Sequence, residues 1–201
     1  MKRLAAAAFA LLAAVQSVSA EGQSVADRFR ECRRSEGQAA VDACTWYLTA
    51  GLNPSVADQV FALTARGVAN FNMRRYTEAL SDLTAALALH PRDTFALRLH
   101  ALAAAELDRM DVAMADADTG LGIDPADAQL LATRAWLHYH RAQYPQAIAD
   151  DTAALAVDPK LARALYVRGL SKQKSGDELG GEADIAAAET LKPDIVTTFG
   201  G

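Results

Sequence analysis

Apolar and small residues return along the chain at a fixed interval of 34 residues. The segments DLTAALALHP (82–91) and DDTAALAVDP (150–159) agree at seven of ten positions and start 68 residues apart, which is two such periods. Each period holds two stretches of about 12–14 residues with apolar positions at helical spacing, so the pattern predicts pairs of helices. A proline column and a leucine column keep the interval without insertion: Pro91, Pro125, Pro159 and Pro193, and Leu63, Leu97, Leu131 and Leu165.

Short polar segments separate the two helices of each pair, and the prolines close the pair. Pro145 stands where a second helix is expected to start, a position at which the missing N–H of proline is tolerated. A single helical hairpin cannot bury its apolar side alone, so neighbouring hairpins must stack. The sequence therefore predicts an all-α solenoid of stacked helix-turn-helix hairpins.

These columns resemble the tetratricopeptide repeat, a 34-residue helix-turn-helix unit with small, large apolar and proline residues at set offsets. The first unit matches through Leu63, Gly67, Tyr76, Ala79, Leu83, Ala86 and Pro91, and the third through Leu131, Ala135, Tyr144, Ala147, Ala154 and Pro159. The second unit is looser, with Met110 at the tyrosine position and Ala117 at the large apolar position. In the fourth, Glu178 replaces the tyrosine and Gly180-Gly181 is expected to interrupt the second helix.

The resemblance covers residues 60–193 and implies a right-handed solenoid whose concave surface is lined by the first helix of each hairpin. The preceding segment 38–48 aligns with the second helix of a hairpin, which predicts a degenerate N-terminal hairpin over residues 21–59. The expected ranges of the four repeat units and of the C-terminal tail are 60–93, 94–127, 128–161, 162–193 (degenerate and capping) and 194–201.

The first twenty residues have the pattern of a secretory signal peptide. A basic start, an apolar run from Leu4 to Val15 and small residues up to Ala20 are in the expected order. The apolar run is shorter than the roughly 20 residues that span a bilayer. We therefore expect cleavage after Ala20 and a periplasmic or secreted mature protein; the alternative is an uncleaved N-terminal anchor.

The charge of the chain argues against nucleic-acid binding. Without Lys2 and Arg3, residues 21–201 carry 18 basic and 25 acidic side chains, a formal charge of −7. Binding to a phosphate backbone depends on Lys and Arg, so an acidic chain is a poor candidate for it. No later apolar run approaches membrane-spanning length, so no membrane insertion of the mature chain is expected.

The two cysteines, Cys32 and Cys44, are separated by eleven residues, too far apart for a C-x-x-C redox motif. In an exported protein an even number of cysteines favours a structural disulfide. The alternative is two free thiols. A disulfide at these positions would join the two helices of the N-terminal hairpin.

The resemblance places a partner-binding groove on the first helices. The candidate residues are Phe61, Thr64, Phe71, Phe95, Arg98, Trp136, Tyr139, Arg163 and Tyr166. Aromatic residues and arginine dominate binding hot spots. For Phe61 and Phe95, packing between repeats is an equal alternative, whereas Trp136, Tyr139 and Tyr166 are expected at the surface. The Lys and Asn residues with which some family members hold a C-terminal carboxylate are missing around Thr64 and Arg98.

One acidic residue recurs in every unit, opposite a basic residue of the first helix. The acidic column is Asp82, Asp116, Asp150 and Asp184, and the basic column is Arg66, His100, Arg134 and Arg168. Repetition in each unit favours a structural role, because a single functional site needs one copy. We predict structural ion pairs between these columns.

No catalytic, metal-binding or cofactor-binding constellation is expected. The chain has no phosphate-binding glycine loop, no G-x-S-x-G and no H-E-x-x-H. His138 and His140 are two residues apart and point in different directions on a helix. The leading hypothesis is a non-enzymatic adaptor that binds a peptide or protein segment in the concave groove. The alternatives are a structural subunit of an envelope complex that docks through an edge or end cap, and an enzyme.

Overall fold

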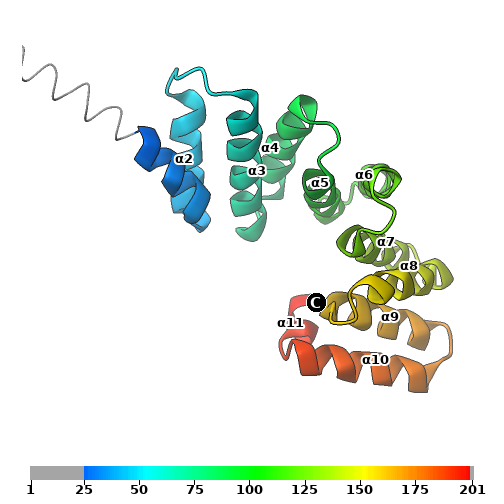
Figure 1. Cartoon of the computed structure of the whole chain (residues 1–201). Helices are drawn as coiled ribbons and strands as arrows, with labels where there is room; N and C mark the ends of the chain where they lie inside the picture. The colour runs from blue at the N-terminus through cyan, green and yellow to red at the C-terminus, as the bar shows by residue number, and fades with distance from the viewer. Residues whose placement is uncertain (1–24, 200–201) are drawn as a thin grey trace, which may run out of the picture. The chain divides into compact units, whose positions relative to one another are not determined.

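The computed structural model describes residues 25–199, and within this range every regular element is an α-helix. The expected signal peptide lies outside the described residues. A first helix over residues 25–34 precedes the labelled helices in Figure 1. These are α2 (Gly37–Thr49), α3 (Val56–Asn72), α4 (Tyr76–Leu89), α5 (Thr94–Glu106), α6 (Met110–Ile123), α7 (Ala128–His140), α8 (Tyr144–Val157), α9 (Ala162–Lys174), α10 (Glu178–Leu191) and α11 (Ile195–Phe199). The all-α solenoid class is confirmed.

The chain divides into two compact units, one up to Leu89 and one from His90. In the first unit, the disulfide Cys32–Cys44 joins the first helix to α2, and both sulfurs are buried. Tyr47 and Ala62 pack in the same cluster, so α3 continues the core that the disulfide begins. The side chain of Ser55 caps α3 by accepting a hydrogen bond from the backbone N–H of its third residue.

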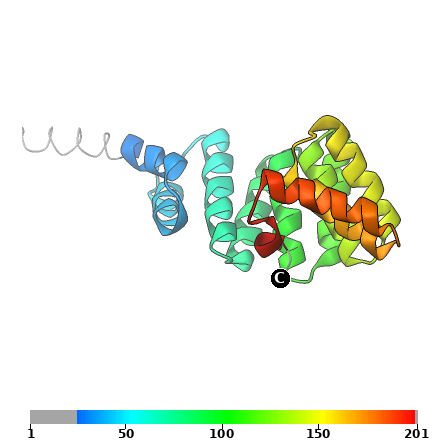
Figure 2. The same ribbon diagram turned by 90° about the horizontal axis from the view of Figure 1, so that it is seen from below.

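The second unit consists of three hairpins, α5–α6, α7–α8 and α9–α10, followed by the short helix α11 (Figure 1). Within this unit α5 packs against α7 and α7 against α9, whereas α6 and α8 do not touch each other among the described residues. The first helices of successive hairpins are therefore the closer set. Figure 2, seen from below, shows α11 folded back beside the last hairpin. We call the side of the second unit formed by α5, α7 and α9 the A-helix face.

The turns inside the hairpins share a left-handed residue at the same 34-residue interval. Its positions are Arg74, Asp108, Ala142 and Gly176, with φ between 55° and 91°. A left-handed residue just after a helix lets the chain reverse and satisfies free carbonyl groups of the last turn. Only the last of the four is glycine, so the hairpin geometry is imposed on three residues that do not favour it.

The expected interruption of the last second helix is wrong, because α10 runs through Gly180 and Gly181. A Cβ atom at Gly169 would lie 2.8 Å from the carbonyl oxygen of Gly181, and one at Gly181 would lie 2.7 Å from that of Gly169. The two glycines therefore let α9 and α10 approach each other more closely than side chains permit. Helix packing outweighs the low helix propensity of glycine here.

We expect Gly169→Ala to lower the free energy of unfolding of the second unit by about 1–3 kcal/mol, because the added methyl group meets backbone. Gly122 in α6 is the matched control, since a Cβ atom there has nothing within 4 Å. Gly122→Ala should raise stability by up to about 1 kcal/mol. Denaturant unfolding measures both changes. Equal effects of the two substitutions would contradict the close approach of α9 and α10.

None of the described helices is both long and apolar enough to cross a bilayer.

Candidate functional site

Arg98 lies on α5, which forms part of the A-helix face. Asp93 caps α5 by accepting a hydrogen bond from the N–H of Ala96, which sets where this helix begins. The guanidinium of Arg98 lies 5.2 Å from the centre of the Phe95 ring, and that ring is 47% exposed. Within residues 25–199 the Arg98 guanidinium makes no hydrogen bond. Burial lowers the pKa of Arg98, and the charge of Asp127 opposes that change.

Arg163, on α9, reaches from the third hairpin of this unit toward the second. Its Nη2 donates to the hydroxyl of Thr133 on α7 at 2.9 Å. Thr133 is fully buried and donates in turn to the carbonyl oxygen of Gln129. Burial lowers the pKa of Arg163 to about 10; the charge of Asp151 acts against this, and the charge of Arg98 acts with it.

Arg98, Thr133 and Arg163 therefore form one group, which we call the arginine site. Its members come from the three successive first helices α5, α7 and α9. The two arginines are 65 residues apart in the sequence, yet each guanidinium is within electrostatic range of the other. Two arginines whose charges interact favour a bound anion, and a carboxylate can accept charge-assisted hydrogen bonds from the Arg98 guanidinium. Both arginines were expected to line the groove, but the sequence did not predict that their charges interact.

Asp151 is an unusual core residue whose charge interacts with that of Arg163. Its side chain on α8 is fully buried, and neither carboxylate oxygen has a hydrogen-bond partner among the described residues. Burial raises the pKa of Asp151 well above its ordinary value, and Arg163 is the charge that opposes this most strongly. The same position of the other repeats holds Leu83, Ala117 or Ile185, all apolar.

An aromatic cluster flanks the arginine site on the second hairpin of this unit. The Trp136 and His140 rings meet edge to face, with centroids 4.3 Å apart. Tyr139 lies 5.6 Å from His140 and 5.9 Å from Tyr144. Burial lowers the pKa of His140, while the charge of Glu106 acts in the opposite direction. Trp136 and Tyr139 remain partly exposed and can contact a partner.

The expectation that Tyr166 lies at the surface is wrong, because this residue is only 4% exposed. It packs in a cluster with Leu165, Ala188 and the fully buried Ile195 of α11. The short helix therefore covers a position of the A-helix face that helical periodicity alone would leave open.

The three candidates of the first unit differ in their surroundings. Phe61 is 37% exposed and meets Phe29 edge to face, with centroids 5.7 Å apart. Phe71 packs edge to face against Tyr76 at 5.4 Å. The hydroxyl group of Thr64 is buried and has no hydrogen-bond partner in the described chain. Ring packing within the first unit thus accounts for much of the contact surface of Phe61 and Phe71.

The repeated acidic column lies against the repeated basic column. In each contact a side chain of the first helix meets an aspartate of the second helix of the same hairpin. The N–O distances are 2.6 Å for Arg66–Asp82, 2.6 Å for His100–Asp116, 2.8 Å for Arg134–Asp150 and 2.7 Å for Arg168–Asp184. The three arginines each bind both carboxylate oxygens of their partners. This geometry fixes both the distance and the rotation of the paired helices.

Four residues after the basic column, polar residues of three repeats also lie near these aspartates, whereas the second repeat has Ala104 there. Asn70 donates to Asp82 at 3.2 Å, and Lys172 lies 2.8 Å from Asp184. Burial alone would raise the pKa of Asp184, but hydrogen bonds from Arg168 and Lys172 hold it below its ordinary value. Sequence reasoning missed this column, although its 34-residue spacing was visible.

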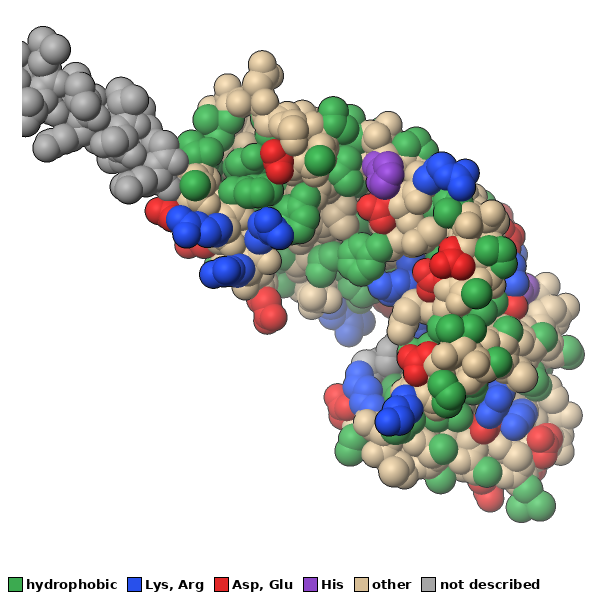
Figure 3. Space-filling view, in the orientation of Figure 1, with side chains coloured by type: hydrophobic (Ala, Val, Ile, Leu, Met, Phe, Trp, Pro, Cys, Tyr) green, Lys and Arg blue, Asp and Glu red, His purple; other side chains and the backbone are tan. Residues whose placement is uncertain are grey.

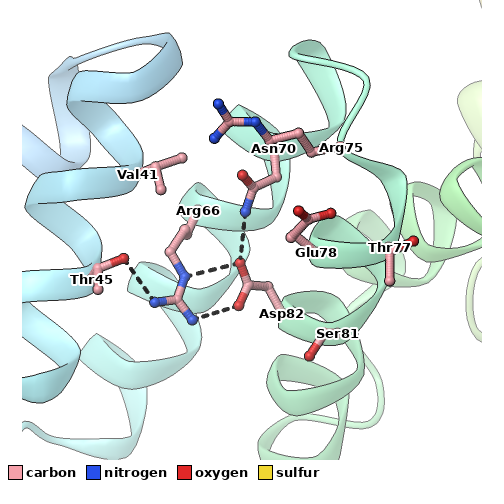
Figure 4. Close-up of a pocket in the computed structure, with 9 residues that line it drawn as sticks. All are labelled: Val41, Thr45, Arg66, Asn70, Arg75, Thr77, Glu78, Ser81 and Asp82. Atoms are coloured by element: carbon pink, nitrogen blue, oxygen red, sulfur yellow. Dashed lines mark hydrogen bonds and ion pairs between the residues drawn. The ribbon is translucent and has the colours of Figure 1, made fainter.

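A cleft of about 420 Å³ opens in the first unit beside one of these pairs (Figure 4). Arg66 closes its base: the guanidinium holds Asp82 and donates to the hydroxyl of Thr45 on α2 at 3.0 Å. A smaller cleft of about 280 Å³ in the second unit has Arg134 in the equivalent place, where it contacts Asp118 on α6. The cleft-facing guanidiniums are thus engaged in joining three helices. The arginine site is the better candidate for a partner, because Arg98 is not so engaged.

The first helix gives the N-terminal end of the chain a basic and aromatic surface. Figure 3 shows Lys and Arg side chains gathered there beside hydrophobic ones. The guanidinium of Arg33 lies 5.9 Å from the ring centre of Phe29 and 5.2 Å from that of Phe61. Phe29 is also stacked on Tyr47, so this aromatic group continues into the disulfide-bonded core.

No family model matches this chain, and no curated protein matches it. Several solved structures, in contrast, are similar to this chain in fold. A MamA structure (residues 41 to the end) from Desulfovibrio magneticus RS-1 has a TM-score of 0.69 and 16% identity, with 86% of this chain and 95% of that chain covered. A tetratricopeptide repeat protein from Parabacteroides merdae has a TM-score of 0.63 and 21% identity, covering 81% and 66%.

A third structure is the first tetratricopeptide-repeat domain of Spaghetti (RPAP3), solved bound to the HSP90 peptide SRMEEVD. Its TM-score is 0.57 and its identity 17%, with 63% of this chain and 99% of that chain covered. These similarities and the 34-residue helix pairs define the class: the chain is a protein of tetratricopeptide-repeat fold.

Proposed function

We propose that this protein is a protein-interaction module whose A-helix face binds an acidic segment of a partner protein. The observation that carries the proposal is the arginine site, where Arg98 makes no hydrogen bond within the described chain and Arg163 lies in electrostatic range. A carboxylate of the partner would accept hydrogen bonds from the Arg98 guanidinium, and the nearby charge of Arg163 would add to the attraction. Phe95 and Trp136 would contact apolar groups beside that carboxylate.

The comparison with solved structures supports the same class of partner. The tetratricopeptide-repeat domain of RPAP3 was solved with SRMEEVD, a peptide with three acidic side chains. This chain lacks the Lys and Asn residues with which some family members hold a C-terminal carboxylate, and Arg98 would supply the cation instead. Arginine binds carboxylates with a planar pair of donors, so the proposed chemistry does not depend on lysine.

We further propose that the module works outside the cytoplasm, in the periplasm or as a secreted protein. The disulfide Cys32–Cys44 is the supporting observation, because structural disulfides persist in oxidising compartments. The partner would then be an exported or envelope protein.

The test is a selection from a display library of random heptapeptides, made with the wild-type protein, Arg98→Gln and Arg92→Gln. Arg92 is an exposed arginine in the turn before α5 and serves as the matched control. We expect the wild type and Arg92→Gln to enrich peptides containing Asp or Glu. Arg98→Gln should lose this preference and bind the best wild-type peptide at least about tenfold more weakly, since charge-assisted bonds contribute roughly 1.5–3 kcal/mol.

The proposal is wrong if the wild type shows no preference for acidic peptides, or if Arg98→Gln keeps it unchanged. Acidic enrichment that survives Arg98→Gln would place the interface at an edge or end cap of the fold.

A further inference from the structure

The cleft of the first unit, between α2, α3 and α4, combines a repeated part with residues that the other repeats lack. The repeated part is the pair of Arg66 and Asp82, in which the guanidinium contacts both carboxylate oxygens. The other residues, each followed by those at the same position of the second, third and fourth repeats, are Asn70 (Ala104, His138, Lys172), Glu78 (Val112, Gln146, Gly180) and Ser81 (Ala115, Ala149, Ala183). Repetition indicates a structural role, so departures gathered around one cleft indicate a local function.

Asn70 is the most deeply placed of these residues, with 4% of its surface exposed. Its amide nitrogen donates to Asp82 at 3.2 Å, which fixes how the amide group is turned. The amide oxygen accepts no hydrogen bond from any described residue, and Figure 4 shows it pointing away from Asp82. An acceptor in a buried position is unfavourable without a donor, so a ligand that donates a hydrogen bond would be stabilised beside it.

The fourth repeat shows which group fits beside the repeated aspartate. There Lys172 occupies the position of Asn70, and its ammonium group lies 2.8 Å from Asp184, which Arg168 also holds. The carboxylate of the repeated pair can therefore take a second cation on this side. In the first repeat the neutral Asn70 supplies no charge, while Glu78 adds a carboxylate from α4. The side chain of Glu78 has no ion pair or hydrogen bond with a described residue.

We propose that this cleft binds a primary ammonium group, carried either by a small amine or by a lysine side chain of a partner protein. The ammonium group donates to the amide oxygen of Asn70 and to the carboxylate of Glu78, with the hydroxyl group of Ser81 as a third acceptor. An ammonium group has three donors and no acceptor, which suits a site made of acceptors. The volume of about 420 Å³ admits the carbon chain as well, which Val41 of α2 would contact. The site lies in the first unit and does not depend on the arginine site.

Two arginines also line the cleft, and one of them opposes a bound cation. Arg66 is neutralised by Asp82 through two hydrogen bonds. Arg75 is exposed, and its Nη1 donates to Gln38 at 2.8 Å. Figure 4 shows the Arg75 guanidinium directed away from Glu78. Its charge should still weaken the binding of an ammonium group, so removal of Arg75 has the opposite expected sign to removal of Glu78.

The experiment titrates the protein with N-acetyl-lysine-amide, with cadaverine, and with N-acetyl-norleucine-amide, which has the carbon chain of lysine without the nitrogen. The ¹⁵N–¹H resonances of the backbone and of the Asn70 side chain report binding, at low salt and neutral pH, where the amines are protonated. We expect the lysine compound and cadaverine to shift the resonances of Asn70 and Ser81, and the norleucine compound to leave them in place. Stronger binding of cadaverine would identify a small amine as the ligand; otherwise a lysine side chain is the ligand.

Four variants test the named residues. Glu78→Gln should weaken the binding of the lysine compound about fivefold, and Arg75→Gln should strengthen it. Asn70→Lys introduces the residue that the fourth repeat has at this position, so it should keep the fold and abolish binding. Glu182→Gln removes an exposed carboxylate of α10 in the second unit and is the matched control, with unchanged affinity expected.

Equal shifts with the lysine and norleucine compounds would overturn the ammonium site, as would an affinity that Glu78→Gln leaves unchanged. Because Glu78 is exposed, its replacement tests the site even where Asn70→Lys fails to fold.

Discussion

Replacement of Arg134 by alanine is expected to lower the free energy of unfolding of the second unit by about 3 kcal/mol. Arg134 donates through Nε and Nη2 to both oxygens of Asp150, each at 2.8 Å, and through Nη1 to Asp118 at 2.9 Å. These hydrogen bonds raise the pKa of Arg134, with the bond to Asp150 as the largest cause. The substitution leaves the buried carboxylate of Asp150 without its main partner, and an uncompensated buried charge is strongly unfavourable.

Denaturant unfolding of the wild type, Arg134→Ala, Asp150→Ala and the double variant measures this pair directly. The double variant should lose clearly less than the sum of the two single losses, because it buries no lone charge. Arg141→Ala is the surface control: Arg141 pairs with the fully exposed Asp111, and its loss should change stability little. A loss for Arg134→Ala no larger than for Arg141→Ala would show that the repeated pairs do not hold the hairpins together.

Removal of the disulfide by Cys32→Ser and Cys44→Ser is expected to destabilise the N-terminal hairpin by about 3 kcal/mol. The bond joins residues 12 positions apart, and closing a loop of roughly this length restricts the unfolded chain by that amount. The effect should be local, because the first helix is held to α2 by this bond and by the small cluster around Tyr47. Hydrogen exchange measures it: amides of residues 25–49 should lose protection.

Amides of α7 to α10 serve as the internal control and should keep their protection, since these helices belong to the other compact unit. Reduction of the wild type should reproduce the pattern of the double serine variant. Unchanged exchange over residues 25–49 would mean that packing alone holds the first helix in place.

The fold class and the repeated pairs could be predicted from the sequence because both depend on local periodicity. A helix places residues three and four apart on one side, so the 34-residue columns report which side each helix buries. The column of Asp82, Asp116, Asp150 and Asp184 was readable for the same reason: any pairing present in one repeat recurs in all. The proposal of a cysteine bridge needed only the even count and the expected export.

Only the tertiary structure decided which side chains of the first helices are exposed and can contact a partner. Tyr166 has the spacing of a groove residue but is buried, because Ile195 of the returning α11 packs on it. Gly181 reads as a helix breaker but lies inside α10, where it allows close contact with Gly169. Burial depends on what packs against a face, and that partner can come from any distance along the chain.

The arginine site shows the same limit at the level of function. Arg98 and Arg163 belong to different repeats and different columns, so no periodic signal joins them. The stacking of first helices brings Arg163 to Thr133 and within electrostatic range of Arg98. The sequence by itself determined the helices, the hairpins and their stacking, because these follow from repeated local pattern. The site was decided by the tertiary structure, because electrostatic coupling depends on distance in space and on the exclusion of water.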